Sequence, residues 1–279
     1  MAALAADTKK RIVGDFARRA AAALVLAPIA LAAVWSGGLV FAGLVALAAV
    51  VMSYEWDRLA GGDGFGLGAA ALMAVQLAAV TAMALGEPGV AAVALAVGIV
   101  VLPVLTRWRG DAAAMGALGV VAIGLPCVAI VWMRELPTLG VALVLWLFAV
   151  VWATDIAAYL VGRTAGGPKL APKISPGKTW SGLFGGVVAA ALVGAGAGAL
   201  LFRDLALWPL AGLAVACAVV AQTGDLCESA LKRRRGVKDT SGLIPGHGGL
   251  LDRLDGLITC APFLAAVVLL GEESGPLWQ

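Results

Sequence analysis

The chain has 279 residues, of which 62% are apolar, a further 37 are glycine and only 13% are charged. Soluble globular domains contain about 45–50% apolar residues with glycine included and about 25% charged residues. This composition therefore excludes a soluble protein, and it equally excludes a disordered one. The net charge of +3 offers no basis for nucleic acid as a partner. We expect an all-α, polytopic membrane protein that forms a single membrane domain over residues 1–279.

Apolar runs divide the sequence into nine predicted membrane spans, because a helix needs about 17–25 mostly apolar residues to cross a bilayer. In chain order these spans are 20–35, 38–54, 67–85, 89–105, 113–133, 139–161, 181–202, 207–227 and 254–271. The first span is interpreted as a retained anchor rather than a signal peptide, since eight further spans follow it. Five spans form an N-terminal half, 1–138. Four form a catalytic half, 139–271, with long polar connections at 162–180 and 228–253.

The positions of the basic residues predict the orientation, because Lys and Arg accumulate in cytoplasmic loops. With a cytoplasmic N-terminus, only Arg134 and Arg203 among the 20 Lys and Arg residues fall outside. The charge distribution therefore predicts nine transmembrane helices, a cytoplasmic N-terminus, and two long connections that both face the cytoplasm.

The sixth span contains an acidic residue, Asp155, with Tyr159 one helical turn later. A carboxylate within a membrane span is energetically costly and marks a functional site by default. We expect Asp155 to face the interior of the bundle, toward a metal ion or a basic connection. A structural ion pair is the alternative.

The first long connection carries two lysines and two hydroxyls around a Pro-Gly turn: Lys173, Ser175, Lys178 and Thr179. A Walker A loop would need a preceding strand and a glycine at position 172, where Pro172 stands. That motif is therefore excluded. A turn that leads into a helix can still bind anions through free backbone N–H groups and the helix dipole. The four side chains are candidates for binding phosphate.

Acidic side chains flank the second long connection. On a helix that continues the eighth span, Asp225, Ser229 and Lys232 share one face, and Asp252 and Asp255 share a face where the ninth span begins. Magnesium prefers oxygen ligands and commonly uses one or two carboxylates together with substrate phosphates. Asp225 and Asp252 are therefore the candidate ligands of one or two magnesium ions.

The basic run at 232–235 has a simpler explanation as a topology signal or a contact for anionic lipid. The adjoining sequences GHGG and LDRLD favour a functional site, because a topology signal needs neither carboxylates at a helix entry nor a glycine-rich turn. The chain's single histidine, His247, lies in that turn. It is interpreted equally well as a catalytic residue or as one that orients the loop.

Residues 229–255 resemble the signature of the phosphatidate cytidylyltransferase (CDP-diacylglycerol synthase) family. The matching pattern is S-x-L-K-R, four residues, K-D-x-S, two residues, and I-P-x-H-G-G-L-x-D-R-L-D. GDLCES at 224–229, KISPGKTWSG at 173–182 and DIAAY at 155–159 are similar to companion stretches of that family and occur in the same order. Ser181 departs from the pattern, since many relatives carry Glu or Gln there, and the first five spans match only in hydropathy.

The resemblance implies transfer of a cytidylyl group from CTP to phosphatidic acid, with a divalent metal, in phospholipid biosynthesis at the cell membrane. It implies metal ligands at Asp225 and Asp252 and catalytic roles for these two residues, Lys232 and His247. The residues expected to bind substrate are Lys173, Ser175, Lys178, Thr179, Ser229, Arg233, Lys238, Asp239, Arg253, Asp155 and Asp255. A homodimer is compatible with the small-residue faces of several spans.

Three other functions account for parts of the sequence. A CTP-dependent kinase of a polyprenol-type lipid would also need a lipid and a nucleotide at one membrane face, but it does not explain the full signature. A cytidylyltransferase for an ether-linked archaeal lipid would differ only in the apolar groove for the tails. A transporter would explain nine spans and Asp155, but not GHGGLLDRLD in a connection.

Overall fold

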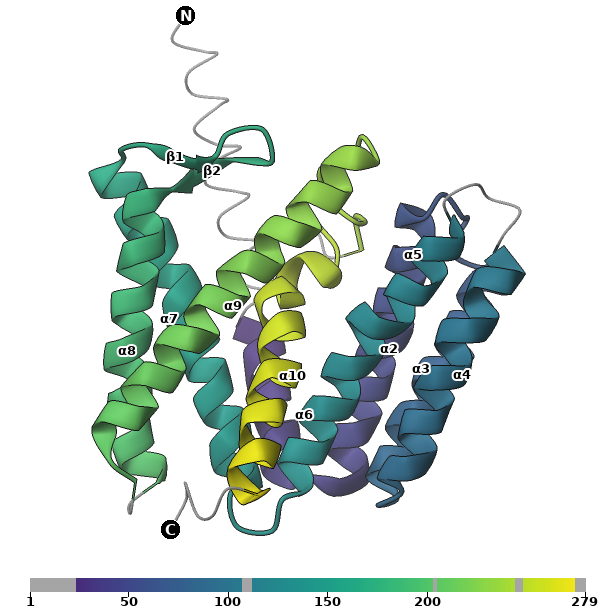
Figure 1. Ribbon diagram of the computed structural model, residues 1–279, viewed down its shortest axis with the longest axis horizontal. Coiled ribbons are helices and arrows are strands. Elements are labelled where there is room, and N and C mark those ends of the chain that lie inside the picture. Colours follow the sequence, from purple (N-terminus) through teal and green to yellow (C-terminus); the bar gives the residue numbers. More distant parts are fainter. Residues whose placement is uncertain (1–23, 107–111, 203–204, 244–247, 274–279) are drawn as a thin grey trace, which may run out of the picture.

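The computed structural model describes residues 24–106, 112–202, 205–243 and 248–273, and it is built mainly from helices (Figure 1). The elements in chain order are α2 (Gly38–Leu59), α3 (Leu67–Ala84), α4 (Pro88–Thr106), α5 (Ala112–Gly119), the π-helical turn η2 (Val120–Gly124), α6 (Leu125–Glu135), α7 (Gly140–Ala165), β1 (Lys169–Ala171), β2 (Ser175–Thr179), α8 (Trp180–Leu201), α9 (Leu207–Arg234) and α10 (Leu251–Glu273).

Eight segments of the described chain are helices long and apolar enough to cross a membrane. One of them, Ala114–Glu135, runs through α5, η2 and α6 without a break. These eight coincide with the second to ninth predicted spans. The first predicted span, 20–35, overlaps a shorter apolar helix, Leu24–Ser36, and begins outside the described residues. The multi-pass helical fold is therefore confirmed.

The helices form two groups that α10 joins. On one side α2 packs against α3, and α3 packs against both α4 and α6. On the other side α8 packs between α7 and α9. Helix α10 contacts α6, α7 and α9, and Figure 1 shows it between the two groups. The division into an N-terminal and a catalytic half remains a prediction, but residues from both sides meet around α10.

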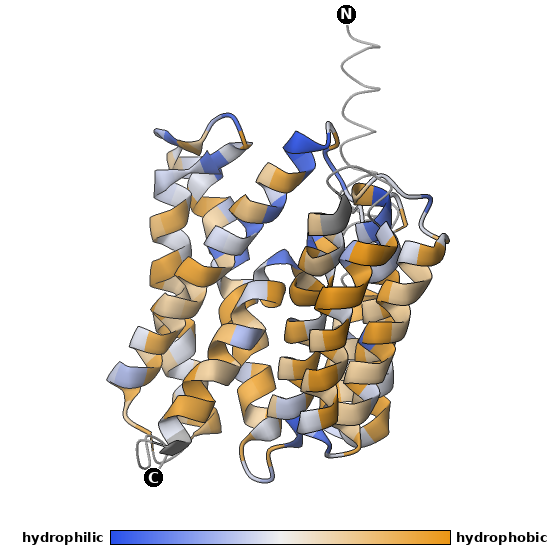
Figure 2. Cartoon of the chain, turned by 45° about the vertical axis from the view of Figure 1, so that its right-hand side comes forward, coloured by the Kyte–Doolittle hydropathy of each residue, from blue (hydrophilic) through white to orange (hydrophobic). Residues whose placement is uncertain are grey.

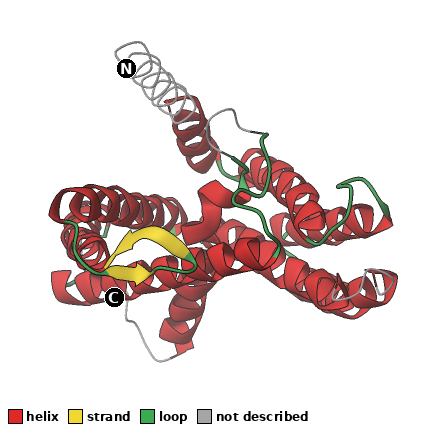
Figure 3. Ribbon diagram, turned by 90° about the horizontal axis from the view of Figure 1, so that it is seen from above, coloured by secondary structure: helices red, strands yellow, loops and turns green. Residues whose placement is uncertain are grey.

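Hydrophilic residues gather mainly at one end of the bundle, which carries the hairpin and the connection from α9 to α10 (Figure 2). The first long connection is more ordered than expected: α7 continues to Ala165, and β1 and β2 then form an antiparallel hairpin that pairs Lys169 with Thr179. The sequence analysis did not predict these strands. Strand β2 contacts α7, α8 and α9, and Figure 3 shows the hairpin in a view along the helices.

Helix α9 continues well beyond its apolar part, as the shared face of Asp225, Ser229 and Lys232 had predicted. The Ser229 hydroxyl donates to Asp225 Oδ1 over 3.2 Å, one turn apart, which places both side chains on one helix face. The helix ends at Arg234, and Gly236 follows with a φ of 70°. This left-handed conformation favours glycine and is common just after a helix. The chain then turns back toward α10, which begins at Leu251.

Candidate active site

A cavity of about 720 Å³ lies at the polar end of the bundle, between α7, the hairpin, α8, α9 and the first turns of α10. Seven of the predicted site residues line it: Asp155, Lys178, Thr179, Asp225, Asp252, Arg253 and Asp255. Its wall also includes apolar parts of α7 and α8, among them Ala158 and Leu183. One space therefore offers carboxylates, cations and a surface made by membrane helices.

Asp225 on α9 is paired with a lysine from the hairpin. Lys178 Nζ lies 2.6 Å from Asp225 Oδ2, and it also donates to Gln222 Oε1 over 3.2 Å. At the cavity wall, the Lys178 side chain is 18% exposed and the Asp225 side chain is 26% exposed. The strand thus carries a cation to the acidic face of α9, and the pair remains accessible to a ligand.

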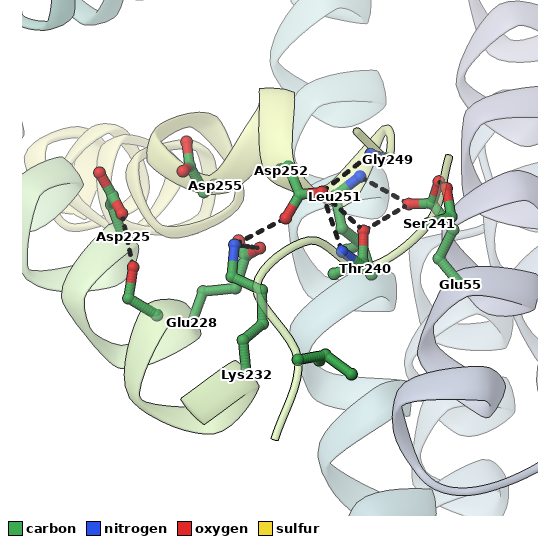
Figure 4. A network of polar contacts seen from close by, with 12 residues as sticks. Glu55, Asp225, Glu228, Lys232, Thr240, Ser241, Gly249, Leu251, Asp252 and Asp255 are labelled. Atoms are coloured by element: carbon green, nitrogen blue, oxygen red, sulfur yellow. Dashed lines mark hydrogen bonds and ion pairs between the residues drawn. The ribbon is translucent and has the colours of Figure 1, made fainter. Parts of the chain in front are cut away.

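Asp252, in the first turn of α10, has hydrogen-bond donors close to both of its carboxylate oxygens. Its Oδ1 accepts from Lys232 Nζ over 2.6 Å. Its Oδ2 accepts from the backbone N–H of Gly249 over 2.8 Å, from the backbone N–H of Thr240 over 2.9 Å, and from the Thr240 hydroxyl over 3.1 Å. Charge-assisted hydrogen bonds of this kind are the strong ones. Asp252 therefore fastens the connecting loop to the start of α10 (Figure 4).

Lys232 lies between two carboxylates and is only 8% exposed. Besides Asp252, its Nζ contacts Glu228 Oε1 at 2.9 Å. Asp225, which the helical spacing places on the same face as Lys232, is paired with Lys178. Lys232 thus links α9 to α10 and does not line the cavity.

Thr179 and Ser181 organise the junction of the hairpin and α8. Thr179, only 4% exposed, caps α8 by accepting from the backbone N–H of Gly182 over 3.1 Å. The Ser181 hydroxyl lies 3.0 Å from that of Thr179 and donates to the carbonyl of Gly166. Ser181, the position that departs from the family pattern, therefore joins the end of α7 to the start of α8.

The other described candidates are not among the residues that line the cavity. Arg233 donates to the carbonyls of Ile174 over 3.2 Å and Val237 over 3.1 Å, so it ties the hairpin tip to the end of α9. Ser229 donates to Asp225, which does line the cavity. The remaining four are Lys173 and Ser175 in the hairpin and Lys238 and Asp239 after α9, and none of them lines the cavity. His247 lies outside the described residues.

The carboxylates fit a magnesium ion only in part. In the described part of the chain, no three His, Cys, Asp or Glu side chains lie close enough together to form a metal site by themselves. Magnesium often takes one or two carboxylates and completes its shell with water and substrate phosphates. Asp225, with one lysine and one serine as partners, suits that arrangement. Asp252 would have to exchange Lys232 for the metal.

One buried acidic residue of the N-terminal group was not predicted from the sequence. Glu55, near the end of α2, has no exposed surface and contacts the loop that precedes α10. A signal was available, since Glu55 directly follows the predicted span 38–54 and the helix continues to Leu59. An acidic residue inside a membrane helix marks a functional site by default.

The comparisons with known proteins agree with the motif. The family model described as the cytidylyltransferase family matches residues 17–270. A Brucella suis protein named phosphatidate cytidylyltransferase is 37% identical over 246 residues, which cover 87% of this chain and 89% of the relative. A Pseudomonas aeruginosa protein of the same name is 36% identical over 266 residues, which cover 90% of this chain and 96% of the relative. The chain belongs to the cytidylyltransferase family.

Proposed function

We propose that this protein is a nucleotidyltransferase that transfers CMP from CTP to phosphatidic acid, with CDP-diacylglycerol and pyrophosphate as products. The name shared by the relatives supports the reaction. The observation that carries the proposal is the single cavity in which Lys178, Asp225 and Arg253 share a wall with apolar parts of membrane helices. A water-soluble nucleotide and a membrane lipid can both reach such a space.

The reaction requires two polyanions to approach each other. A phosphate oxygen of phosphatidic acid attacks the α-phosphorus of CTP, and the bond from that phosphorus to the oxygen bridging to the β-phosphate breaks. The nucleophile is already anionic, so no serine or cysteine has to be activated. The residues contribute mainly position and charge. Lys178 and Arg253 balance phosphate charge, and Asp225 keeps Lys178 in place before substrate binds.

Magnesium is proposed as the cofactor, with Asp225 as one ligand and Asp252 as a second. When bound, the ion would neutralise phosphate charge and orient the leaving pyrophosphate. Asp225 can provide an oxygen once Lys178 turns to a phosphate, because its carboxylate is partly exposed at the cavity wall. Asp252 would keep its three loop donors on Oδ2 and offer Oδ1.

We also propose that the polar end of the bundle faces the cytoplasm and that the protein lies in the cell membrane. The distribution of Lys and Arg supports this orientation. Single cysteines at position 178 should react with an impermeant thiol reagent only from the cytoplasmic side, and cysteines at position 274 only from outside. Labelling of position 178 from outside would refute the orientation. A homodimer remains a prediction.

The activity test uses the purified full chain in mixed micelles with phosphatidic acid, labelled CTP and magnesium chloride. We expect label from the cytosine ring in a lipid-soluble product, together with one pyrophosphate per product. Transfer of label from the γ-phosphate alone would identify a lipid kinase, and would overturn the proposal. An ether-linked lipid that outcompetes phosphatidic acid would assign the archaeal-type substrate.

A further inference from the structure

We propose that Glu55 is a positioning residue for cytidylyl transfer: its buried carboxylate holds the two described ends of the loop before α10, at 240–241 and 250–251, in the positions that orient Asp252 and Lys232. The inference rests on the proposed function for its kinetic part, and on the geometry alone for its structural part. Glu55 comes from α2, almost 200 positions before the residues it contacts, so the N-terminal group of helices supports the site from outside the cavity.

Four donor groups lie within hydrogen-bond distance of the Glu55 carboxylate. Oε1 accepts from the backbone N–H of Leu250 over 2.8 Å and from the Ser241 hydroxyl over 2.6 Å. Oε2 accepts from the backbone N–H of Leu251 over 2.8 Å and lies 3.3 Å from the Thr240 hydroxyl, whose single hydrogen goes either to Glu55 or to Asp252. A buried carboxylate is costly unless its lone pairs are satisfied. Here both ends of the loop supply the donors.

The backbone partners of Glu55 belong to the start of α10. The first N–H groups of a helix have no partner within the helix, and the helix dipole favours a negative charge there. Glu55 satisfies Leu250 and Leu251 at this end, while Asp252 satisfies Gly249. Two carboxylates from different helices thus share the task of stabilising the entry into α10.

Thr240 couples the two carboxylates. Its hydroxyl lies 3.3 Å from Glu55 Oε2 and 3.1 Å from Asp252 Oδ2, so it can donate to either (Figure 4). Asp252 then contacts Lys232 through its other oxygen at 2.6 Å. A displacement of Glu55 would therefore move Thr240 and alter the carboxylate that faces Lys232.

The close contact between the loop and the two carboxylates explains why Gly248 and Gly249 of GHGG are glycines. A Cβ on Gly249 would lie 2.1 Å from Thr240 Oγ1 and 2.6 Å from Glu55 Oε1. A Cβ on Gly248 would lie 2.8 Å from Asp252 Oδ2, and its φ of 82° disfavours other residues. Only glycine lets both carboxylates approach the loop backbone this closely.

Glu55 acts through these residues and not on the substrate. Its exposed fraction is 0%, and it is not among the described residues that line the cavity. Its effect should therefore appear in the rate of the chemical step. Binding of the lipid tails against α7 and α8 should be little changed.

The first test is Glu55→Gln in the full-length protein. The side chain keeps its shape, but its NH2 group replaces one of the two acceptor oxygens. In either orientation of the amide, this donor faces the N–H of Leu250 or of Leu251, so one hydrogen bond is lost. We expect kcat to fall at least about tenfold and KM for phosphatidic acid to change by less than about threefold. Amide hydrogen exchange at 248–251 should become faster. Unchanged kcat, or unchanged exchange at 248–251, would overturn the proposal.

A matched control lies two residues away on the same helix. Asp57 is 4% exposed and accepts from the backbone N–H of Gly64 over 3.1 Å, in the loop between α2 and α3. Asp57→Asn should lower the melting temperature without changing kcat of the folded protein or exchange at 248–251. If Asp57→Asn lowers kcat as much as Glu55→Gln does, the effect is general destabilisation and the proposal fails.

A second variant, Thr240→Val, keeps the test decisive if Glu55→Gln does not fold. It removes the shared hydroxyl and leaves the backbone N–H that Asp252 accepts. We expect a smaller loss of kcat, about threefold or more, and the double variant should be less impaired than the product of the single effects. Wild-type kcat in Thr240→Val would contradict the coupling.

A wild-type protein without transfer activity would refute the proposed function, whereas the exchange experiment would still decide whether Glu55 holds the loop.

Discussion

Two lysine–aspartate pairs at the same end of the bundle differ in what surrounds them. Asp225 and Lys178 lie 2.6 Å apart with 26% and 18% of their side-chain surface exposed, whereas Asp252 and Lys232, also 2.6 Å apart, expose only 5% and 10%. Asp225 has one further donor, the Ser229 hydroxyl, but Asp252 accepts three more hydrogen bonds from the loop. The first pair is accessible to a ligand, whereas the second links α9 to α10, so a metal ion on Asp252 would first have to displace Lys232.

This difference changes how the two aspartates should respond to the same substitution. The sequence alone treats them as equivalent carboxylates at the ends of two spans. In the structure, removing the charge of Asp252 affects a buried network, and removing that of Asp225 affects an accessible one. Substitution of Asp252 should therefore lower both activity and stability. Substitution of Asp225 should lower activity and leave stability nearly unchanged.

Asp252→Asn should have the largest effect. We expect at least about a hundredfold loss of kcat/KM and a decrease of about 3 kcal/mol in the free energy of unfolding, because one member of a buried ion pair is removed. The transfer assay and chemical unfolding in detergent would measure the two quantities. Full stability with lost activity would show that Asp252 does not fasten the loop.

Asp225→Asn should lower kcat/KM by about a hundredfold, which corresponds to about 2.7 kcal/mol of transition-state stabilisation. The free energy of unfolding should change by less than about 1 kcal/mol, because the pair with Lys178 is partly exposed. The magnesium concentration for half-maximal rate should rise, since Asn keeps one oxygen but loses the charge. Near-normal turnover at saturating magnesium would exclude Asp225 as a metal ligand.

Lys178→Ala should be less harmful, with a loss of about tenfold or more in kcat/KM and an increased KM for CTP, if Lys178 transfers from Asp225 to a phosphate. Arg235→Ala is the matched control, because Arg235 is basic but does not line the cavity. Its effect should stay within about threefold. Equal losses in both variants would mean that the basic residues act only through topology.

Asp63→Asn should have the smallest effect. Asp63 is exposed before α3 and accepts from the backbone N–H groups of Phe65 over 2.9 Å and Gly66 over 2.7 Å. Asn can accept both bonds, so kcat/KM should remain within about twofold of the wild-type value. A large loss measured in the same transfer assay would show that charge anywhere on this face controls the rate, and would remove the contrast between Asp225 and Asp252.

Local patterns predicted much of the structure. Apolar runs located the eight long helices, and helical spacing placed Asp225 and Ser229 in contact. The same reasoning could not pair Lys178 with Asp225, because they are 47 positions apart in sequence and meet only through the hairpin. The hairpin itself has strands of three and five residues, too short for alternation to be recognised among Gly, Pro and Lys.

Hydropathy and helical periodicity depend on neighbouring residues, and so the sequence by itself determined a multi-pass helical membrane protein with one polar end and a cluster of site residues around α9 and α10. Which carboxylate is accessible, which is buried, and which residue of the N-terminal group completes the site depend on distances between helices far apart in the chain. Only the tertiary structure brings Glu55 to Leu250 and Leu251. The physical reason is that a buried carboxylate is stable only where packing supplies its hydrogen-bond donors.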